Sequence, residues 1–240
     1  MMKTAIIIPS HLKAKRLPNK PLLEINGKPM ILHVWERAKK TKIEDVFVAT
    51  ANNEIADLIN SVGGNVILTG EHHTTGTDRI NEAREKLKLD HEIIINVQGD
   101  MPNINPETIN LLNNFMITNP NAHASTVAGD VLEKEWLDPN VVKVKTLKKL
   151  EINQFLPAND FNRNFKKDEN FVYHHIGLYA YTSGLLKSFV SLEKSSNEKS
   201  RSLEQMRLLD NNYNIYVGYT KDMPLSVDTQ EDLEEIRKII

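Results

Sequence analysis

Basic residues gather directly after the first predicted strand. The segment Pro9–Leu22 (PSHLKAKRLPNKPL) carries lysine, arginine and histidine between prolines that stiffen the loop. Such a loop can hold the phosphates of a nucleotide, because arginine and lysine donate charge-assisted hydrogen bonds to phosphate oxygens. Composition alone fits a solvated basic loop equally well. Its place after a strand favours phosphate binding, since ligands of open α/β sheets bind beyond the carboxyl ends of the strands.

Two aspartates are candidate metal ligands. Asp100 ends the segment NVQGD at the tip of the fourth predicted strand. Mg²⁺ takes one or two protein carboxylates and completes its coordination with phosphates and water. The alternative is a turn aspartate that caps its own backbone. Asp228, in VDTQEDL, precedes the last predicted helix and could cap it, but if that helix packs on the first sheet the two aspartates can share one metal.

Parallel βαβ units would position both segments. The first hundred residues alternate β-branched runs with amphipathic helices, which is typical of a parallel sheet with helices on both faces. The predicted strands are residues 4–8, 45–49, 65–68 and 92–97. Ile55, Leu58, Ile59 and Val62 recur at the spacing of one helix face. Asn105 followed by Pro106 predicts the start of another helix, which should run to about residue 118.

The second half of the chain is more irregular and richer in strands. We expect strands at 141–145 and 176–181, with a polar stretch at 159–170 between them. A helix at 203–209, a strand at 215–217 and a last helix that begins at Thr229 should follow, and the last helix should pack on the first half. The polar run 193–201 predicts a mobile loop. We therefore expect a single domain over residues 1–240, with a β-rich insertion at about 124–200.

Composition excludes several classes of protein. The 240 residues carry 30 basic and 32 acidic side chains, a formal net charge of -2, which argues against a dedicated nucleic-acid or membrane-surface binder. Cysteine is absent, so disulfides, thiolate metal sites and cysteine nucleophiles are excluded, and a hard cation such as Mg²⁺ is the expected metal. We interpret MMKTAIIIPS as a first strand and not as a leader, and we expect a cytoplasmic protein.

Eight short strings occur in the order found in one enzyme family. They are RLPNKPL, INGKPMI, HTTGTDR, NVQGD, DPNVVKV, HHIGLYAY, LEQMR and VDTQEDL. Over nearly its whole length the chain resembles the 3-deoxy-manno-octulosonate cytidylyltransferases, the CMP-Kdo synthetases. The resemblance implies a Rossmann-like α/β fold, with a mostly parallel sheet between two helical layers. It also implies a homodimer, with the β-rich insertion carrying part of the sugar and dimer surfaces.

The resemblance further implies roles for individual residues. Arg16, Lys20 and Asp100 would be catalytic, with Arg16 and Lys20 on the β- and γ-phosphates, and Asp100 and Asp228 would bind Mg²⁺. The nucleotide contacts would be completed by Pro9, Thr75, Gly76, Thr77 and Arg79. The sugar would meet Gln98, His175, Tyr179, Glu204 and Gln205. Without the resemblance, His175 and Tyr179 could equally be core residues of a strand. Glu204 and Gln205 could equally lie on an exposed helix face.

The implied reaction activates 3-deoxy-manno-octulosonate (Kdo). Its anomeric hydroxyl would attack the α-phosphorus of CTP, giving CMP-Kdo and pyrophosphate. Positioning and charge neutralisation carry most phosphoryl-transfer catalysis, so no protein nucleophile is required. The implied partners are CTP and a sugar acid, with no nucleic acid and no membrane.

Five residues depart from the family pattern. His11 and Ala14 replace an arginine and a serine of the phosphate loop, and Met101 replaces a glutamate beside Asp100. Leu156 and Pro157 replace a serine and an arginine, for which Arg163 or Lys143 could compensate. Histidine is mostly neutral at pH 7 and donates fewer hydrogen bonds than arginine, so this exchange removes a permanent bidentate donor from the phosphate loop.

These departures keep two alternatives open. The substrate could be an amino-substituted octulosonate or a nonulosonic acid. The chain could instead bind nucleotide with little turnover. A glycosyltransferase on a related fold is disfavoured, because a single aspartate follows the fourth strand where such enzymes carry an aspartate-x-aspartate motif.

Overall fold

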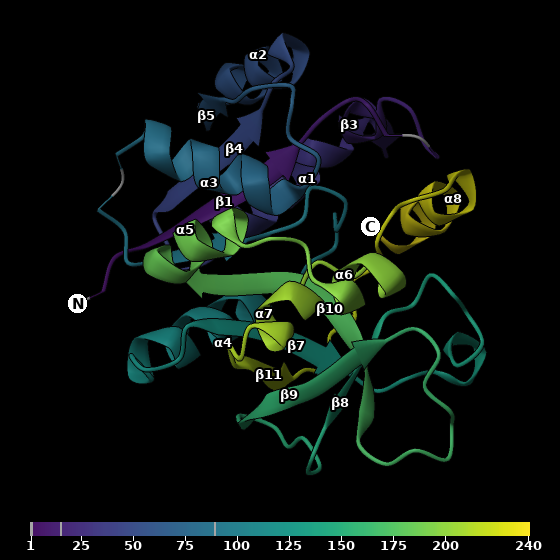
Figure 1. Ribbon diagram of the computed structural model, residues 1–240. Coiled ribbons are helices and arrows are strands. Elements are labelled where there is room, and N and C mark those ends of the chain that lie inside the picture. Colours follow the sequence, from purple (N-terminus) through teal and green to yellow (C-terminus); the bar gives the residue numbers. More distant parts are fainter. Residues whose placement is uncertain (1, 15, 89) are drawn as a thin grey trace. The chain divides into compact units, whose positions relative to one another are not determined.

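The computed structural model describes residues 2–14, 16–88 and 90–240, which divide into two compact units (Figure 1). The first unit consists of Met1–Asn110 and Pro224–Ile240, and the second of Leu111–Met223. The chain passes from the first into the second within helix α4 (Pro106–Thr118). As predicted, Asn105 caps this helix, since its Oδ1 accepts a hydrogen bond from the N–H of Glu107 at 2.9 Å.

Four parallel strands form the centre of the first unit. The order β5-β4-β1-β6 places β1 between β4 and β6. The strands are β1 (Thr4–Ser10), β4 (Asp45–Thr50), β5 (Asn65–Leu68) and β6 (Ile93–Asn96). Residues 5–8 of β1 are fully buried, as a continuous apolar run in a parallel sheet requires. The predicted strands are therefore confirmed to within one or two residues.

Three helices connect these strands and pack on them. They are α1 (Met30–Lys39), α2 (Asn53–Ser61) and α3 (Gly76–Lys86). The connections through α1 and α2 lead outward from β1, whereas the connection through α3 returns past β1 to β6. Right-handed crossovers therefore put α3 on the opposite face from α1 and α2. The connection direction reverses between β1 and β6, so the carboxyl ends of these two strands border the expected ligand crevice.

The last segment of the chain completes the first unit. Helix α8 (Gln230–Ile239) begins after Thr229, whose side chain accepts from the N–H of Asp232 at 3.2 Å. Leu233 and Ile236 are buried in a cluster formed with Leu17, Ile25, Met30 and Val227. Between β1 and α1 lie a short helix η1 (Lys20–Leu22) and a hairpin of β2 (Glu24–Ile25) and β3 (Lys28–Pro29). The prediction that the last helix packs on the first half is confirmed.

The second unit is built on five strands with mixed directions. They follow the order β10-β7-β11-β9-β8, and β10 also pairs with β8, so the pairings close into a ring. The strands are β7 (Ala124–Gly129), β8 (Lys143–Thr146), β9 (Phe155–Asn162), β10 (Val172–Thr182) and β11 (Ile215–Tyr219). A turn of helix, η2 (Glu133–Glu135), lies between β7 and β8.

Three short helices complete this unit, and one of them corrects a prediction. They are α5 (Ser183–Ser191), α6 (Ser196–Arg201) and α7 (Met206–Asp210). The mobile loop predicted at 193–201 is wrong, because α6 occupies most of it. Glu198 of α6 is buried and bonds Nε and Nη2 of Arg207 at 2.7 and 2.6 Å, which anchors α6 to α7. No helix among the described residues is long and apolar enough to cross a membrane.

Candidate active site

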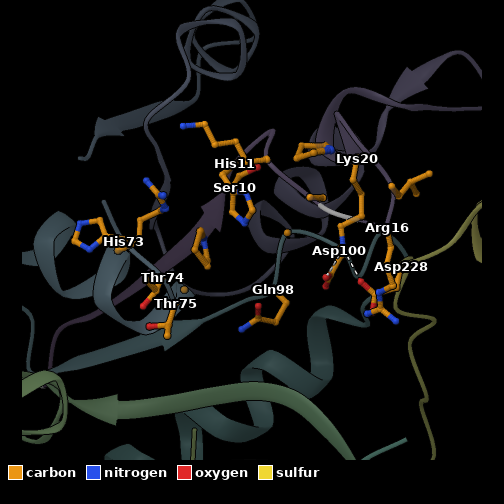
Figure 2. A pocket seen from close by; sticks show the side chains of 18 residues that line it. Ser10, His11, Arg16, Lys20, His73, Thr74, Thr75, Gln98, Asp100 and Asp228 are labelled. Atoms are coloured by element: carbon orange, nitrogen blue, oxygen red, sulfur yellow. Dashed lines mark hydrogen bonds and ion pairs between the residues drawn. The ribbon is translucent and has the colours of Figure 1, made fainter. Parts of the chain in front are cut away.

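A cavity of about 330 Å³ opens in the first unit where β1 and β6 end (Figure 2). Its walls come from the loop after β1, the loop before α3 and the start of α3, the turn after β6, and Asp228 two residues before α8. The lining residues are Pro9, Ser10, His11, Lys13, Ala14, Arg16, Leu17, Lys20, Pro21, His73, Thr74, Thr75, Gly76, Arg79, Gln98, Gly99, Asp100 and Asp228. Segments far apart in the sequence therefore meet at the predicted crevice.

Lys20 links the two candidate metal ligands. Its ammonium donates to Asp100 Oδ2 at 2.8 Å and to Asp228 Oδ1 at 3.0 Å. Arg16 Nη2 lies 3.0 Å from Asp228 Oδ2. Burial opposes the charge on Lys20, but the charges and hydrogen bonds of the two aspartates outweigh it and raise the pKa of Lys20. Two carboxylates thus converge on one positive charge, as Figure 2 shows.

Asp228 is not needed to cap α8, because other residues cap this helix. Thr229 and Asp232 form the capping box of α8, and the Asp228 N–H itself donates to Asp232 Oδ2 at 3.0 Å. The Asp228 side chain remains directed at Arg16 and Lys20. The backbone adds a further link, because the Val227 N–H donates to the Asp100 carbonyl at 2.9 Å.

Close backbone packing shapes the floor of the cavity. A Cβ on Gly99 would lie 2.9 Å from the Pro9 carbonyl oxygen, so only glycine allows the turn after β6 to approach β1 this closely. A Cβ on Gly76 would lie 3.3 Å from the Pro9 ring. Beside them, the Gln98 side chain donates to Asn96 Oδ1 at 3.0 Å and lines the cavity. The predicted Pro9, Gly76 and Gln98 are therefore brought together.

The start of α3 supplies a second wall. Thr75 caps the helix by accepting from the Asp78 N–H at 3.1 Å. Arg79 is buried and donates to the Gly70 carbonyl at 3.1 Å and to Thr69 Oγ1, and burial lowers its pKa. Thr75 and Arg79 line the cavity. Thr77, with 4% of its surface exposed, lies outside the lining found among residues 2–14, 16–88 and 90–240.

His11 gives the phosphate loop a neutral group. Burial lowers its pKa, and the positive charges of Arg79 and Lys20 lower it further. The ring therefore acts as a hydrogen-bonding group at neutral pH and not as a permanent cation. His11, Lys13 and Arg79 also line a smaller adjoining cavity of about 200 Å³, which includes Asn52.

Of the predicted sugar-binding residues, four belong to the second unit. His175 on β10 lies 3.0 Å from Thr126 Oγ1 through Nε2 and packs edge-on against Phe161. Burial and the neighbouring His174 lower the pKa of His175 to about 3, so the ring is neutral. Its centroid lies 5.3 Å from that of Tyr179.

The other residues of this group are also largely buried. The Tyr179 hydroxyl has no hydrogen-bond partner within the described parts of the chain, and burial raises its pKa well above the ordinary value. Gln205 is 8% exposed, and Glu204 lies 3.8 Å from Arg207 Nη2. The exposed helix face considered for Glu204 and Gln205 is therefore wrong, because both lie just before α7 and Gln205 is buried.

The residues at the departures from the family pattern divide between the two units. His11 and Ala14 line the cavity, and Met101 is buried beside Asp100 in the chain. Leu156 and Pro157 lie on β9, opposite Val217 and Tyr216 of β11.

Neither basic residue considered as compensation has a free charged group. The ammonium of Lys143 is fully buried and donates to three backbone carbonyls at 2.9 to 3.3 Å. Arg163 Nη1 donates to the Arg201 carbonyl at 2.7 Å. Both side chains therefore hold the backbone of the second unit.

Several residues that line the cavity are not among those predicted from the sequence. Lys13 belongs to the basic loop and His73 and Thr74 to HTTGTDR, so both signals were present in the sequence. Ser10 carries no distinguishing pattern beyond its place at the end of the first strand. Its hydroxyl is buried without a hydrogen-bond partner in the described part of the chain.

Comparisons with known proteins show the family to which the chain belongs. The family model described as cytidylyltransferase matches residues 5–215. The 3-deoxy-manno-octulosonate cytidylyltransferase 2 of Actinobacillus pleuropneumoniae serotype 5b is 40% identical, and the match covers 100% of this chain and 99% of that protein. The 3-deoxy-manno-octulosonate cytidylyltransferase of Rhodopseudomonas palustris is 41% identical over 99% of this chain and 98% of its own.

A solved structure extends the likeness to three dimensions. It is the CMP:2-keto-3-deoxy-manno-octonic acid synthetase complexed with CTP, which matches with a TM-score of 0.90 and 34% identity. The match covers 99% of this chain and 98% of that one. The chain therefore belongs to the 3-deoxy-manno-octulosonate cytidylyltransferases, a nucleotidyltransferase family with this α/β fold.

Proposed function

We propose that this protein transfers the cytidylyl group of CTP to Kdo, forming CMP-Kdo and pyrophosphate. The convergence of Asp100 and Asp228 on Lys20, in a crevice at the strand ends, is the observation that carries the proposal. The relatives that match along the full chain are named for this reaction.

The chemistry is an in-line displacement at the α-phosphorus. The anomeric oxygen of Kdo forms the new P–O bond, its proton leaves, and the bond between the α-phosphorus and the bridging oxygen breaks to release pyrophosphate. Arg16 and Lys20 stabilise the negative charge on the departing β- and γ-phosphates. No protein nucleophile takes part.

Asp100 and Asp228 would hold Mg²⁺. The structure offers a test of fit, because these two carboxylates already stabilise a cation, the Lys20 ammonium, at 2.8 and 3.0 Å. Two carboxylates with room for phosphate oxygens match the ligands that Mg²⁺ prefers. When bound there, Mg²⁺ would neutralise phosphate charge beside the reacting phosphorus.

The nucleotide would bind along the loop after β1 and the start of α3. Pro9, Thr75, Gly76 and Arg79 line the cavity and would contact the cytidine, while Thr77 would support the α3 turn from behind. An anion near the first turn of α3 also gains from the helix dipole.

We infer that the sugar acid is bound by five residues, because its hydroxyls and carboxylate need both donors and acceptors. They are Gln98, His175, Tyr179, Glu204 and Gln205. The buried Tyr179 hydroxyl, which lacks a hydrogen-bond partner among the described residues, supports this role because it gains a partner when a hydroxyl-rich ligand binds.

Pyrophosphate release from CTP and Mg²⁺, with and without Kdo, tests the proposal. We expect release only when both substrates are present. A parallel assay with amino-substituted octulosonate and nonulosonic acids tests whether the substrate is a different sugar acid. Pyrophosphate release with one of these acids and not with Kdo would reassign the substrate. CTP binding without release for any sugar acid would instead support a nucleotide-binding homologue with little turnover.

We further infer a homodimer in the cytoplasm, with residues of the insertion at about 124–200 supplying part of the dimer and sugar surfaces. Sedimentation velocity of the full chain tests the oligomeric state. A monomer at micromolar concentration would contradict the dimer.

A further inference from the structure

Two imidazoles and one carboxylate converge at the loop before α3 and its second turn. One ligand atom from each of His72, His73 and Glu82 lies within 4.8 Å of the other two. His73 Nε2 is in hydrogen-bond contact with Glu82 Oε2, and the two imidazole centroids are 4.3 Å apart. In Figure 2, His73 lies at the other side of the cavity from Asp100 and Asp228. The cluster is therefore distinct from the acidic pair.

The backbone at Gly70 keeps the three side chains together. Its N–H donates to Glu82 Oε2 at 2.9 Å, and a Cβ at this position would clash with Cε1 and Nδ1 of His72. Glycine thus lets the His72 ring lie against the loop. The side chains of His73 and Glu82 are only 9% and 20% exposed, so packing already holds two of the three groups in place.

We propose that His72, His73 and Glu82 form a Zn²⁺ site at the edge of the nucleotide cavity. Two imidazole nitrogens, one carboxylate oxygen and a water are a ligand set that Zn²⁺ takes, whereas Mg²⁺ prefers oxygen ligands throughout. When the ion binds, it takes the place of the proton between His73 Nε2 and Glu82 Oε2, and a neutral imidazole bound through Nε2 carries its one proton on Nδ1.

The Lys86 ammonium competes with this ion for the Glu82 carboxylate. Its ammonium lies 2.7 Å from Glu82 Oε1 and donates to the Leu68 carbonyl at 2.8 Å. This contact leaves Glu82 Oε2 for the ion, but the nearby positive charge weakens the binding of any cation. Removal of that charge is therefore expected to tighten the site.

Calorimetric titration of Zn²⁺ into chelator-stripped protein, with Mg²⁺ in excess, tests the proposal. The wild type should bind one ion at the cluster, and Co²⁺ in its place should give the visible absorption of a low-coordinate site with nitrogen ligands. His72→Ala, which removes a ligand, and Gly70→Ala, which displaces the same ring, should each weaken binding at least about tenfold. Lys86→Gln should strengthen it. His123→Ala, at an exposed histidine of the second unit, is the matched control and should leave the affinity unchanged.

Three outcomes would overturn the proposal. These are no Zn²⁺ binding, equal affinity in the wild type and both weakening variants, and binding that is lost only in Asp100→Asn. His72→Ala and Gly70→Ala act on one ligand by different routes, so a folding defect in one of them, seen by circular dichroism, leaves the other decisive.

Discussion

At the scale of single residues, the Lys20 ammonium lies where two carboxylates of the cavity stabilise a positive charge. It bridges two carboxylates that are 80 and 208 positions away in the chain. Removal of either carboxylate would weaken both the contact with Lys20 and the binding of a metal ion. The Asp100 side chain is 24% exposed, and an amide has nearly the same size and shape as the carboxylate, so its replacement creates no cavity.

Asp100→Asn is therefore expected to lower the turnover number at least about a hundredfold while the fold is retained, because a charge that stabilises the reacting phosphates is lost. Pyrophosphate release measures the turnover, and thermal unfolding measures the fold. Asp57→Asn, at an exposed position of α2, is the control and should match the wild type. Near-normal turnover of Asp100→Asn would contradict the metal assignment.

His175 makes stability depend on pH. Its folded-state pKa is about 3, below the ordinary 6.5, so the unfolded chain binds more protons between these values. The stabilising contribution is complete above pH 6.5 and is lost as the pH falls. Between pH 7 and pH 5 the wild type should lose about 2 kcal/mol of unfolding free energy through this residue alone.

Denaturant unfolding of ligand-free His175→Gln should show a pH dependence that is smaller by this amount. His123→Gln, at an exposed histidine, is the matched control. Identical pH profiles for His175→Gln and the wild type would mean that His175 is not held neutral.

Single residues of the site could be predicted from the sequence only in part. Asp100 and the basic loop are visible as polar groups after strands, because the strand ends of an open sheet are where ligands bind. The bridge made by Lys20 could not be predicted, since it depends on a tertiary contact between three distant segments. The eight family strings, and not spacing, singled out Glu204 and Gln205.

At the scale of elements, the pairing of α6 with α7 depends on a buried ion pair. The side chains of Arg207 and Glu198 are 5% and 8% exposed, and the Arg207 guanidinium also lies 5.1 Å from the Phe189 ring centroid. A charge buried in this way is costly when its partner is removed.

Glu198→Gln should therefore lower the unfolding free energy by about 3 kcal/mol, since the guanidinium loses its nearest carboxylate. Glu193→Gln, at an exposed residue before α6, should change it little. Chemical denaturation of both variants provides the measurement. The double variant Glu198→Gln with Arg207→Met should recover part of the loss, and no recovery would argue against an electrostatic cause.

The same ion pair explains why the elements could not all be predicted. β-branched runs and helical periodicity located the four parallel strands and the last helix, because burial of one face leaves a pattern in the sequence. The segment 193–201 has no such pattern, since its helix is anchored by charged groups. Polar composition therefore indicated a loop where the tertiary contact makes a helix.

At the scale of the whole molecule, the first unit is assembled from two separate stretches of chain. The later stretch carries both Asp228 and the fully buried Ile236 of α8. Loss of the α8 contacts would therefore weaken the fold and the site together.

Ile236→Ala should lower the unfolding free energy by about 3 kcal/mol through the cavity that it creates, and should weaken CTP binding in the same protein. Ile239→Ala, at a residue that is 54% exposed on the same helix, should cost less than about 0.5 kcal/mol. Denaturant titrations and equilibrium CTP binding measure the two effects. Weakened stability with unchanged CTP affinity would mean that the packing of α8 does not affect the nucleotide site.

The interrupted course of the first unit also constrains how the protein is made. A ribosome completes the strands β1, β4, β5 and β6 early but releases Asp228 and α8 only after the whole of the second unit. During synthesis, Lys20 can meet Asp100 long before it can meet Asp228. Until then the nascent chain lacks one of its two acidic groups, and the nucleotide crevice matures only after the second unit has been synthesised.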